Sequence, residues 1–187
     1  MTSLSDALGP VLETPRLRLR PPQESDLEPL IAVMGDEETA RYIGGVQSPP
    51  LVWRALAALI GHWAIRGYGF FVLEDRETGD WIGRVGPWYP HEWPQPEVGW
   101  TIARQHWGKG YAAEAAARAL DWVFDDLGWE SVAHLIHKDN AGSASVARKL
   151  GSTNSGREVA VPGFDMQVDI WGQSREDWSR NRAALQR

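Results

Sequence analysis

The chain has 187 residues, no cysteine and a formal net charge of −6 at pH 7. These values exclude disulfides, thiolate metal sites and thiol nucleophiles, and they disfavour nucleic acid as the main partner, because phosphate-backbone binding needs a basic face. We expect a single domain over residues 1–187. We also expect a cytoplasmic protein that does not bind membranes, since the opening MTSLSDALGP lacks a basic-then-apolar signal and no apolar run approaches the ~20 residues that span a bilayer.

The periodicity of apolar residues predicts the elements in chain order. The first half contains a strand at 16–20, helices at 27–34 and 48–63, and strands at 68–74, 81–88 and 97–102. The second half contains a long helix at 108–127, a strand at 132–137, a helix at 141–150, strands at 155–161 and 164–171, and a final helix capped by Ser174. Ser48 is the candidate N-cap of the second helix, and Glu114 with Arg118 forms an expected i, i+4 pair. The order β-α-α-β-β-β-α-β-α-β-β predicts a mixed α and β fold.

The segment 97–113, EVGWTIARQHWGKGYAA, carries the strongest functional pattern. A predicted strand runs into a turn with Gly108 and Gly110, where a helix begins. Glycines let the backbone approach a bulky anion, and the first helical turn adds unpaired N–H groups and a positive dipole end. Lys109 and Arg104 add positive charge. The turn is therefore a candidate diphosphate cradle.

This turn has three other possible interpretations. A nucleoside-triphosphatase P-loop needs Gly-Lys followed by Ser or Thr, and here Gly110 follows Lys109. A Rossmann-type site matches Gly108, Gly110 and Ala113, although its loop normally follows the first strand of a βαβ unit, with an acidic residue about 20 positions later. A tight strand-to-helix turn without a ligand also fits. The surrounding motifs decide between them.

Gln105-His106-Trp107-Gly108-Lys109-Gly110 resembles the acetyl-CoA motif of the GNAT superfamily, Q/R-x-x-G-x-G/A. Asn140-Ala141-Gly142-Ser143 and the run ARKLG at 147–151 look like the second motif on the CoA side. The opening LETPRLRLR at 12–20 resembles the start of the RimJ/RimL type, the ribosomal-protein N-terminal acetyltransferases. The resemblance covers about residues 11–173, in the same order and spacing.

The resemblance implies the GNAT fold, of the α/β (α+β) class. Its mixed, mostly antiparallel sheet would have six to seven strands, splayed between the two central strands and flanked by about four helices plus a C-terminal helix. It also implies acetyl-CoA as cosubstrate and no metal. A parted strand edge would pair with the pantetheine arm, and backbone N–H groups of the turn would hold the pyrophosphate, so that the side chains of His106 and Trp107 would be replaceable. The implied cofactor-binding residues are Thr101, Ile102, Ala103, Gln105, His106, Trp107, Gly108, Lys109, Gly110, Tyr111, Asn140 and Ser143.

Acetyl transfer to an amine needs a neutral amine, and a free alkylamine has a pKa near ~10. Glu97 is the predicted general base, directly or through water, because partial burial beside Val98 and Trp100 would raise its pKa toward neutrality. The alternative role for Glu97 is a solvated carboxylate at a strand edge. His91 and Glu92, in the preceding loop, are reserve candidates.

The departing thiolate raises the question of a general acid. Many GNAT members carry a tyrosine seven residues after the asparagine of the second motif, and this chain has Ala147 there. Either Ser143 donates a proton or the thiolate leaves unassisted, since thiols are far more acidic than alcohols. Ser143 also fits a purely structural role at the helix start. Asn140 is placed with the catalytic residues and fits the N-cap position of the same helix.

The sequence says least about the residues that would bind the acceptor amine. Aromatic side chains near the third strand are candidates to line it, namely Trp88, Tyr89, Trp93 and Trp100, although packing is the alternative role for such residues. No histidine pair has metal-ligand spacing; His134 and His137 are three apart on a predicted strand and would point to opposite faces.

The predicted function is transfer of acetyl from acetyl-CoA to a primary amine, either a protein N-terminus or a small molecule, by direct attack in a ternary complex. The alternatives are a CoA-binding sensor or scaffold without turnover and, less favoured, a Rossmann-type nucleotide-binding domain. Such an enzyme is expected as a monomer or a homodimer.

Overall fold

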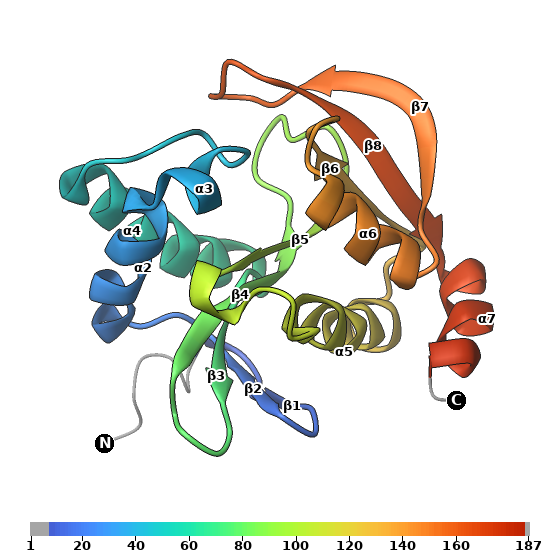
Figure 1. The fold of residues 1–187 in the computed structure, drawn as a ribbon. Coiled ribbons are helices and arrows are strands. Elements are labelled where there is room, and N and C mark those ends of the chain that lie inside the picture. The colour runs from blue at the N-terminus through green and yellow to red at the C-terminus, as the bar shows by residue number, and fades with distance from the viewer. Residues whose placement is uncertain (1–7, 186–187) are drawn as a thin grey trace.

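The computed structural model describes residues 8–185, and its centre is one eight-stranded sheet. The spatial order of the strands is β1-β2-β3-β4-β5-β6-β8-β7 (Figure 1). All neighbouring strands are antiparallel except β5 and β6, which run parallel. The strand bounds are β1 Leu12–Glu13, β2 Leu17–Arg20, β3 Phe71–Asp75, β4 Trp81–Trp88, β5 Glu97–Ile102, β6 Ser131–Ile136, β7 Thr153–Ala160 and β8 Gln167–Ser174.

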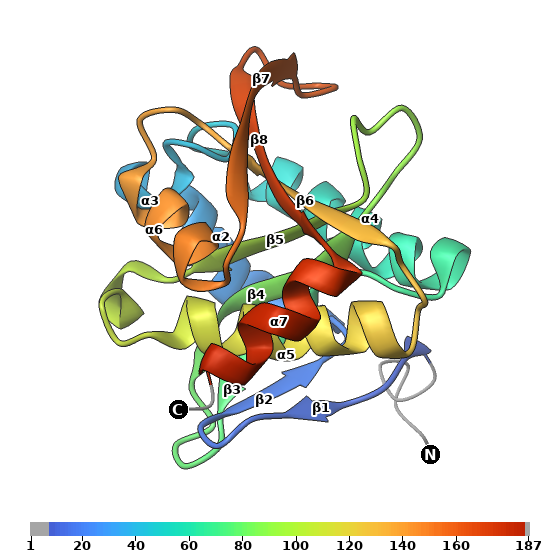
Figure 2. The ribbon, with the colours of Figure 1, turned by 90° about the vertical axis from the view of Figure 1, so that its right-hand side faces the viewer.

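Helices cover both faces of this sheet (Figures 1 and 2). The amphipathic α5 packs its alanine-rich stripe, with Leu120, Val123 and Phe124, against the core side chains of β2 to β5. On the other face α2 and α4 pack together around Leu30 and Leu56. The bounds are α2 Leu27–Gly35, α3 Glu37–Ala40, α4 Pro49–Arg66, α5 Tyr111–Asp125, α6 Ala141–Lys149 and α7 Arg175–Leu185, with 3₁₀ turns at Glu24–Asp26 and Arg104–His106.

The sheet parts in its middle, between β5 and β6. Strand β5 pairs with β4 at every residue from Glu97 to Ile102, whereas it pairs with β6 only at Glu97 and Ala133. Beyond that point the unit formed by β6, β8 and β7 lies above β5 in Figure 1. The predicted GNAT fold with a splayed sheet is therefore confirmed, and the seam between β5 and β6 is where a ligand can reach strand backbone.

Several boundaries differ from the predicted ones. The sheet has eight strands rather than six or seven, because the two-residue β1 pairs with β2. The short α3 was not predicted; Asp36 begins it by accepting a hydrogen bond from the N–H of Thr39 at 3.0 Å. Strand β8 starts at Gln167, so Phe164 lies in the turn before it and not in the strand.

Caps explain which helix starts were predicted well. The final helix begins after Ser174, whose Oγ accepts from the N–H of Asp177 at 3.1 Å while Asp177 accepts in return, so the predicted cap is confirmed. Ser48 holds the N-cap position of α4 but its side chain makes no capping hydrogen bond, and Pro49 alone marks that start. Helix α5 begins at Tyr111, three residues later than predicted, because Gly108 and Gly110 take left-handed φ angles of 74° and 82°.

Candidate active site

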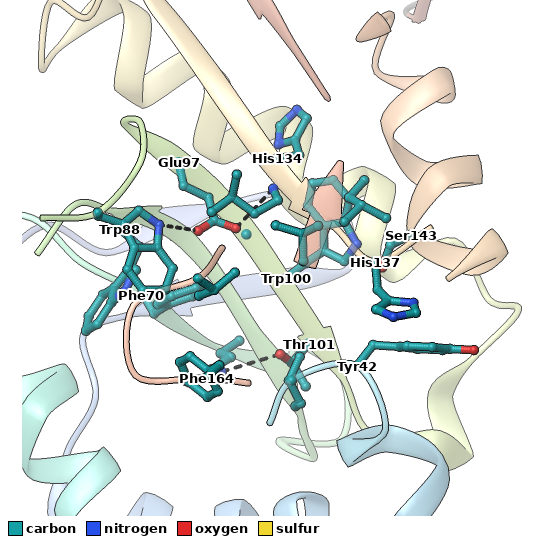
Figure 3. A pocket seen from close by; sticks show the side chains of 18 of the residues that line it. Tyr42, Phe70, Trp88, Glu97, Trp100, Thr101, His134, His137, Ser143 and Phe164 are labelled. Atoms are coloured by element: carbon teal, nitrogen blue, oxygen red, sulfur yellow. Dashed lines mark hydrogen bonds between the residues drawn. The ribbon is translucent and has the colours of Figure 1, made fainter. Parts of the chain in front are cut away.

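A cavity of about 410 Å³ lies along the seam, between the sheet and the α2–α4 pair. Its walls are mostly apolar, with contributions from α2, α4, β4, β5, β6 and the turn before β8. Figure 3 shows the Glu97 carboxylate inside it, with Trp88 and Phe70 on one side and Trp100 on the other. Among the lining residues of the described chain, two carry a formal charge at neutral pH, Glu97 and Arg84.

Glu97 lies at the start of β5, where β5 and β6 begin to part, and its side chain projects into the cavity. Its side chain is buried, with the residue 9% exposed. The indole N–H of Trp93 donates to Oε2 at 2.7 Å, and the N–H of Leu135 on β6 donates to Oε1 at 3.4 Å. Burial raises the pKa of Glu97 to about 7, and these two donors with the positive charge of Arg84 oppose the shift. The predicted rise is thus confirmed, and it places a half-ionised carboxyl in the cavity near neutral pH.

The row of side chains on this face follows from strand pairing. Trp88 stands opposite Glu97, Gly86 opposite Gly99, and Arg84 opposite Thr101. A Cβ on Gly86 would come within 2.6 Å of the Gly69 carbonyl oxygen, and one on Gly99 within 3.1 Å of the Phe70 ring. Because neither glycine has a side chain, the Phe70 ring can pack directly against the sheet between Glu97 and Arg84. Sequence reasoning missed Arg84 and Phe70. The alternation of β4 could have placed Arg84 on the same face as Trp88, whereas Phe70 lies just before β3.

His134 and Trp100 form the seam's inner wall. The Nδ1 of His134 donates to the carbonyl of Val98 at 2.6 Å, and Nε2 accepts from the Ser152 hydroxyl at 3.0 Å. The ring of Trp100 lies 4.9 Å from this imidazole. Burial lowers the pKa of His134 to about 4, so the ring is neutral. Strand β6 ends at Ile136, so the predicted alternation does not extend to His137, and both histidines line the cavity.

The turn before α5 offers unpaired N–H groups, though not all of those expected. The N–H groups of His106 and Trp107 donate to Ala103 and Arg104 carbonyls at 2.8 and 3.1 Å inside a 3₁₀ turn. The expectation that both groups are free for a pyrophosphate is therefore wrong in this conformation. Within the described chain, the N–H groups of Gly108, Lys109 and Gly110 and of the first three residues of α5 make no hydrogen bond. The anion-binding turn therefore offers Gly108 to Gly110 from the predicted range 105–110, together with the first turn of α5.

The parted edge of β5 also differs in detail from the expected one. The N–H of Ala103 donates to Ile82 of β4, so by strand alternation Thr101 and Ala103 turn their backbone groups away from the seam. Val98 and Ile102 face it, because their carbonyls accept from His134 and from the indole of Trp107. Trp100 lies midway between them and presents its backbone to the same side. Of the three predicted residues only Ile102 offers its main chain there, and Trp100 was missed as a backbone contributor.

Trp107 acts through its side chain as well. Its indole N–H donates to the Ile102 carbonyl at 2.7 Å, which ties the turn to the end of β5. The side chain was expected to be replaceable, and this hydrogen bond is a structural contact that the expectation did not include. Lys109 and Gln105 lie on the exposed outer side of the same turn.

The start of α6 lies across the seam from β5. Asn140 is the N-cap, since its Oδ1 accepts from the N–H of Ser143 at 3.0 Å. The predicted cap is confirmed, and because Asn140 fills it, the Ser143 hydroxyl has no capping function. Both residues line the cavity, and within the described chain that hydroxyl makes no hydrogen bond. Ala147, at the position of the usual tyrosine, is fully buried beside Trp171.

The remaining predicted residues divide between the cavity and its outside. Trp88, Trp93 and Trp100 line it, whereas Tyr89 is not among the lining residues and instead donates its N–H to His62 at 3.3 Å. The reserve candidates His91 and Glu92 are also outside, with side chains 93% and 79% exposed. The loop therefore turns Trp93 inward and these two outward.

The described residues also show two absences, one of metal-ligand clusters and one of membrane-spanning helices. No cluster of three or more His, Asp or Glu side chains has the arrangement of a metal site within residues 8–185. In the same range, no helix combines the length and the apolar character that crossing a bilayer requires.

Known proteins resemble this chain in sequence and in fold. The acetyltransferase (GNAT) domain family matches residues 16–153. The uncharacterised protein YkkB of Bacillus subtilis (strain 168) is 33% identical over 148 residues, 75% of this chain and 83% of that protein. The uncharacterised N-acetyltransferase YoaA of the same organism is 28% identical, over 79% of this chain and 85% of its own length. A crystal structure of an acetyltransferase from Agrobacterium tumefaciens str. C58 superposes with a TM-score of 0.79, at 29% identity over 89% of this chain and 95% of that one.

Proposed function

Because the chain belongs to the acetyltransferase (GNAT) family, whose members transfer acetyl from acetyl-CoA to amines, we propose that it acetylates a primary amine bound in the seam cavity, with Glu97 as the general base. The observation that carries the proposal is the buried Glu97 carboxyl, which faces the cavity with a pKa of about 7. A base with this pKa is half ionised at neutral pH and can take a proton from an ammonium or from a water next to it.

The residues present fit acetyl-CoA. The free N–H groups at the start of α5 suit its diphosphate, and the β5 edge at Trp100 and Ile102 suits the amide groups of its pantetheine arm. When bound, acetyl-CoA supplies the activated acyl group. Lys109, Gln105 and Tyr111 belong to the same turn, so we retain them as cofactor-binding candidates. Four other predicted cofactor-binding residues are retained only as supports of that backbone: Thr101, Ala103, His106 and Trp107.

In the proposed step, Glu97 accepts one proton from the amine, directly or through a water. The nitrogen lone pair then forms the new bond to the acetyl carbon as the bond to sulfur breaks. Ser143, whose hydroxyl faces the cavity, or a water gives a proton to the thiolate and takes up the second proton that the acetylated nitrogen releases. Asn140 holds Ser143 at that place through the cap of α6. Trp88, Trp93 and Trp100 surround the amine.

Two further parts of the proposal rest on sequence. The opening LETPRLRLR at 12–20 supports a place near the RimJ/RimL type, because β1 and β2 carry its leucines into the core. We also propose that residues 1–187 form one domain, monomeric or homodimeric, in the cytoplasm.

The test is release of CoA from acetyl-CoA with a panel of amines, with the acetylated product identified by mass. The panel contains peptides with free N-termini, polyamines and amino acids. Amine-dependent CoA release with a product heavier by one acetyl group is the expected result. Binding of acetyl-CoA without acetylation of any amine in the panel, including a protein extract, would contradict turnover and favour a CoA-binding module.

A further inference from the structure

Arg84 lies deep beside the cavity and has no acidic partner. Its Nε is 3.4 Å from the Thr101 hydroxyl, a long hydrogen bond, and its guanidinium carbon lies 4.8 Å from the centre of the Phe70 ring. Within the described chain, no carboxylate oxygen comes within 4.0 Å of it, and Glu97 acts on it only at longer range. Arg84 keeps some accessible surface, and it lines the cavity. The terminal nitrogens are thus available to a group in the cavity.

A second buried arginine of this chain, Arg20, is paired with carboxylates and serves as a comparison for Arg84. Arg20 is 7% exposed, and its two terminal nitrogens donate to the carboxylate of Asp26 at 2.7 and 2.8 Å. Its Nε donates to Glu74 at 2.7 Å. A buried guanidinium is normally paired in this way, because an isolated charge loses its hydration. Arg84 departs from that rule, and the departure occurs on the wall of the cavity.

The environment makes the charge of Arg84 costly. Burial lowers its pKa to about 10, and the attraction of Glu97 opposes this shift only in part. A second negative charge, brought by a ligand, would offset the lost hydration. The guanidinium fork matches a carboxylate with two parallel hydrogen bonds.

Arg84 and Glu97 face the same space from the same side of the sheet. Arg84 is opposite Thr101, four residues along β5 from Glu97, which places their backbones about 13 Å apart. Gly86 and Gly99 fill the positions between them on the two strands. The Phe70 ring packs over Gly99 in that gap, 4.8 Å from the Arg84 guanidinium carbon. The Arg84 and Glu97 side chains and the Phe70 ring line one cavity, so a small molecule with a positive and a negative end would lie over this ring, with one end near each charge.

We infer that the acceptor is an amine that also carries a carboxylate, with its carboxylate on Arg84 and its amine beside Glu97. This inference rests on the proposed function and names the substrate class of the same site. The apolar walls, which include Leu30, Met34 and Leu59, suit an acceptor with an apolar side chain. Free apolar amino acids have all three features.

The experiment compares acceptors that differ only in the carboxylate. Phenylalanine, leucine and methionine are each assayed beside the corresponding amide and the amine that lacks the carboxyl group. The amides are at least as easily deprotonated, so a preference for the acids cannot come from amine basicity. We expect kcat/KM for the acids to exceed that for both analogues by at least about tenfold. Arg84→Gln should remove this preference mainly through KM, and Arg84→Lys should restore part of it.

Arg180→Gln is the control, because Arg180 is an exposed arginine on α7 that does not line the cavity. It should keep the preference. A binding measurement separates recognition from folding: N-acetylphenylalanine should raise Tm more than its amide does, and only when Arg84 is present. Far-UV circular dichroism checks that each variant is folded.

The outcomes separate the two proposals. Acetylation of acids, amides and plain amines at equal kcat/KM would overturn the carboxylate inference and leave the proposed function standing. An equal loss on all acceptors in a folded Arg84→Gln variant would also overturn it. If no amine is acetylated, the proposed function fails, and the Tm comparison still decides the other question: equal or absent stabilisation by the acid and its amide overturns the inference.

Discussion

Arg16 on the β1–β2 turn holds Glu114 in the first turn of α5, across nearly a hundred residues of sequence. Its Nε and Nη2 donate to Glu114 Oε2 at 2.7 and 2.6 Å, and its Nη1 donates to the Lys109 carbonyl at 2.9 Å. Thr14 completes the group through a hydrogen bond from its hydroxyl to Glu114 Oε1 at 2.6 Å. The predicted partner of Glu114 was Arg118, and the structure replaces that helical pair with a brace on the diphosphate-binding turn.

This brace predicts an effect on cofactor binding. Arg16→Gln should raise KM for acetyl-CoA about 3- to 10-fold and change kcat little, because the turn loses the contact that fixes the Lys109 carbonyl. Arg16 is 46% exposed, so we expect a stability loss no larger than about 1 kcal/mol. Initial-rate kinetics and thermal unfolding measure the two effects. Arg180→Gln, which removes an exposed ion pair on α7, is the control and should alter neither constant.

Glu97→Gln should change the pH dependence of the reaction. With a base of pKa about 7, kcat/KM of the wild type should rise with pH up to that value and then level off. The variant keeps the size of the side chain but cannot accept a proton. Its kcat/KM should fall at least about 100-fold at pH 8, and the inflection near pH 7 should disappear. Glu92→Gln, an exposed carboxylate on the loop just before β5, is the control. Unchanged kcat/KM at every pH in Glu97→Gln would remove Glu97 from the mechanism.

Much of the architecture could be predicted from local pattern. The glycines at 108 and 110 fix the turn before α5, and the Asn140 and Ser174 caps fix two helix starts, since each depends on residues within one turn. The position of Glu97 where β5 and β6 begin to part followed from the predicted strand together with the resemblance to the GNAT motifs. Local chemistry and order along the chain were enough for these features.

The rest depends on contacts between distant parts of the chain. Glu114 satisfies Arg16 and not its helical neighbour, and Arg84 reaches the cavity only because β4 pairs with β5 in one register. The use of the His106 and Trp107 N–H groups inside a 3₁₀ turn is a matter of φ and ψ angles that their residue types do not dictate. Alternation along β4 indicates which face Arg84 shares with Trp88, but the pairing register and the partners of side chains leave no signal in one sequence.

Ser143→Ala tests the proposed proton donor. The hydroxyl faces the cavity without a hydrogen bond inside the described chain, while Asn140 alone caps α6, so its removal should leave the helix intact. We expect kcat to fall more than KM for acetyl-CoA rises. Stopped-flow detection of the released thiol separates these constants. A rise in KM with constant kcat would make Ser143 a binding residue only, and no change in either would show that the thiolate leaves unassisted.

Because the buried His134 imidazole is neutral, we expect the folded protein to lose stability in acid. Its folded pKa of about 4 lies below the ordinary histidine pKa of 6.5, so between these values the unfolded chain binds more protons than the folded one. The contribution of His134 is therefore complete above pH 6.5 and is lost as the pH falls toward 4. Denaturant unfolding from pH 7.5 to 4.5 measures this slope. His134→Gln should be less stable at pH 7.5, because the bonds to Val98 and Ser152 are weakened, and should show a smaller further loss in acid. His91→Gln, exposed and outside the cavity, should keep the wild-type slope; an equal slope in His134→Gln would contradict a neutral buried imidazole.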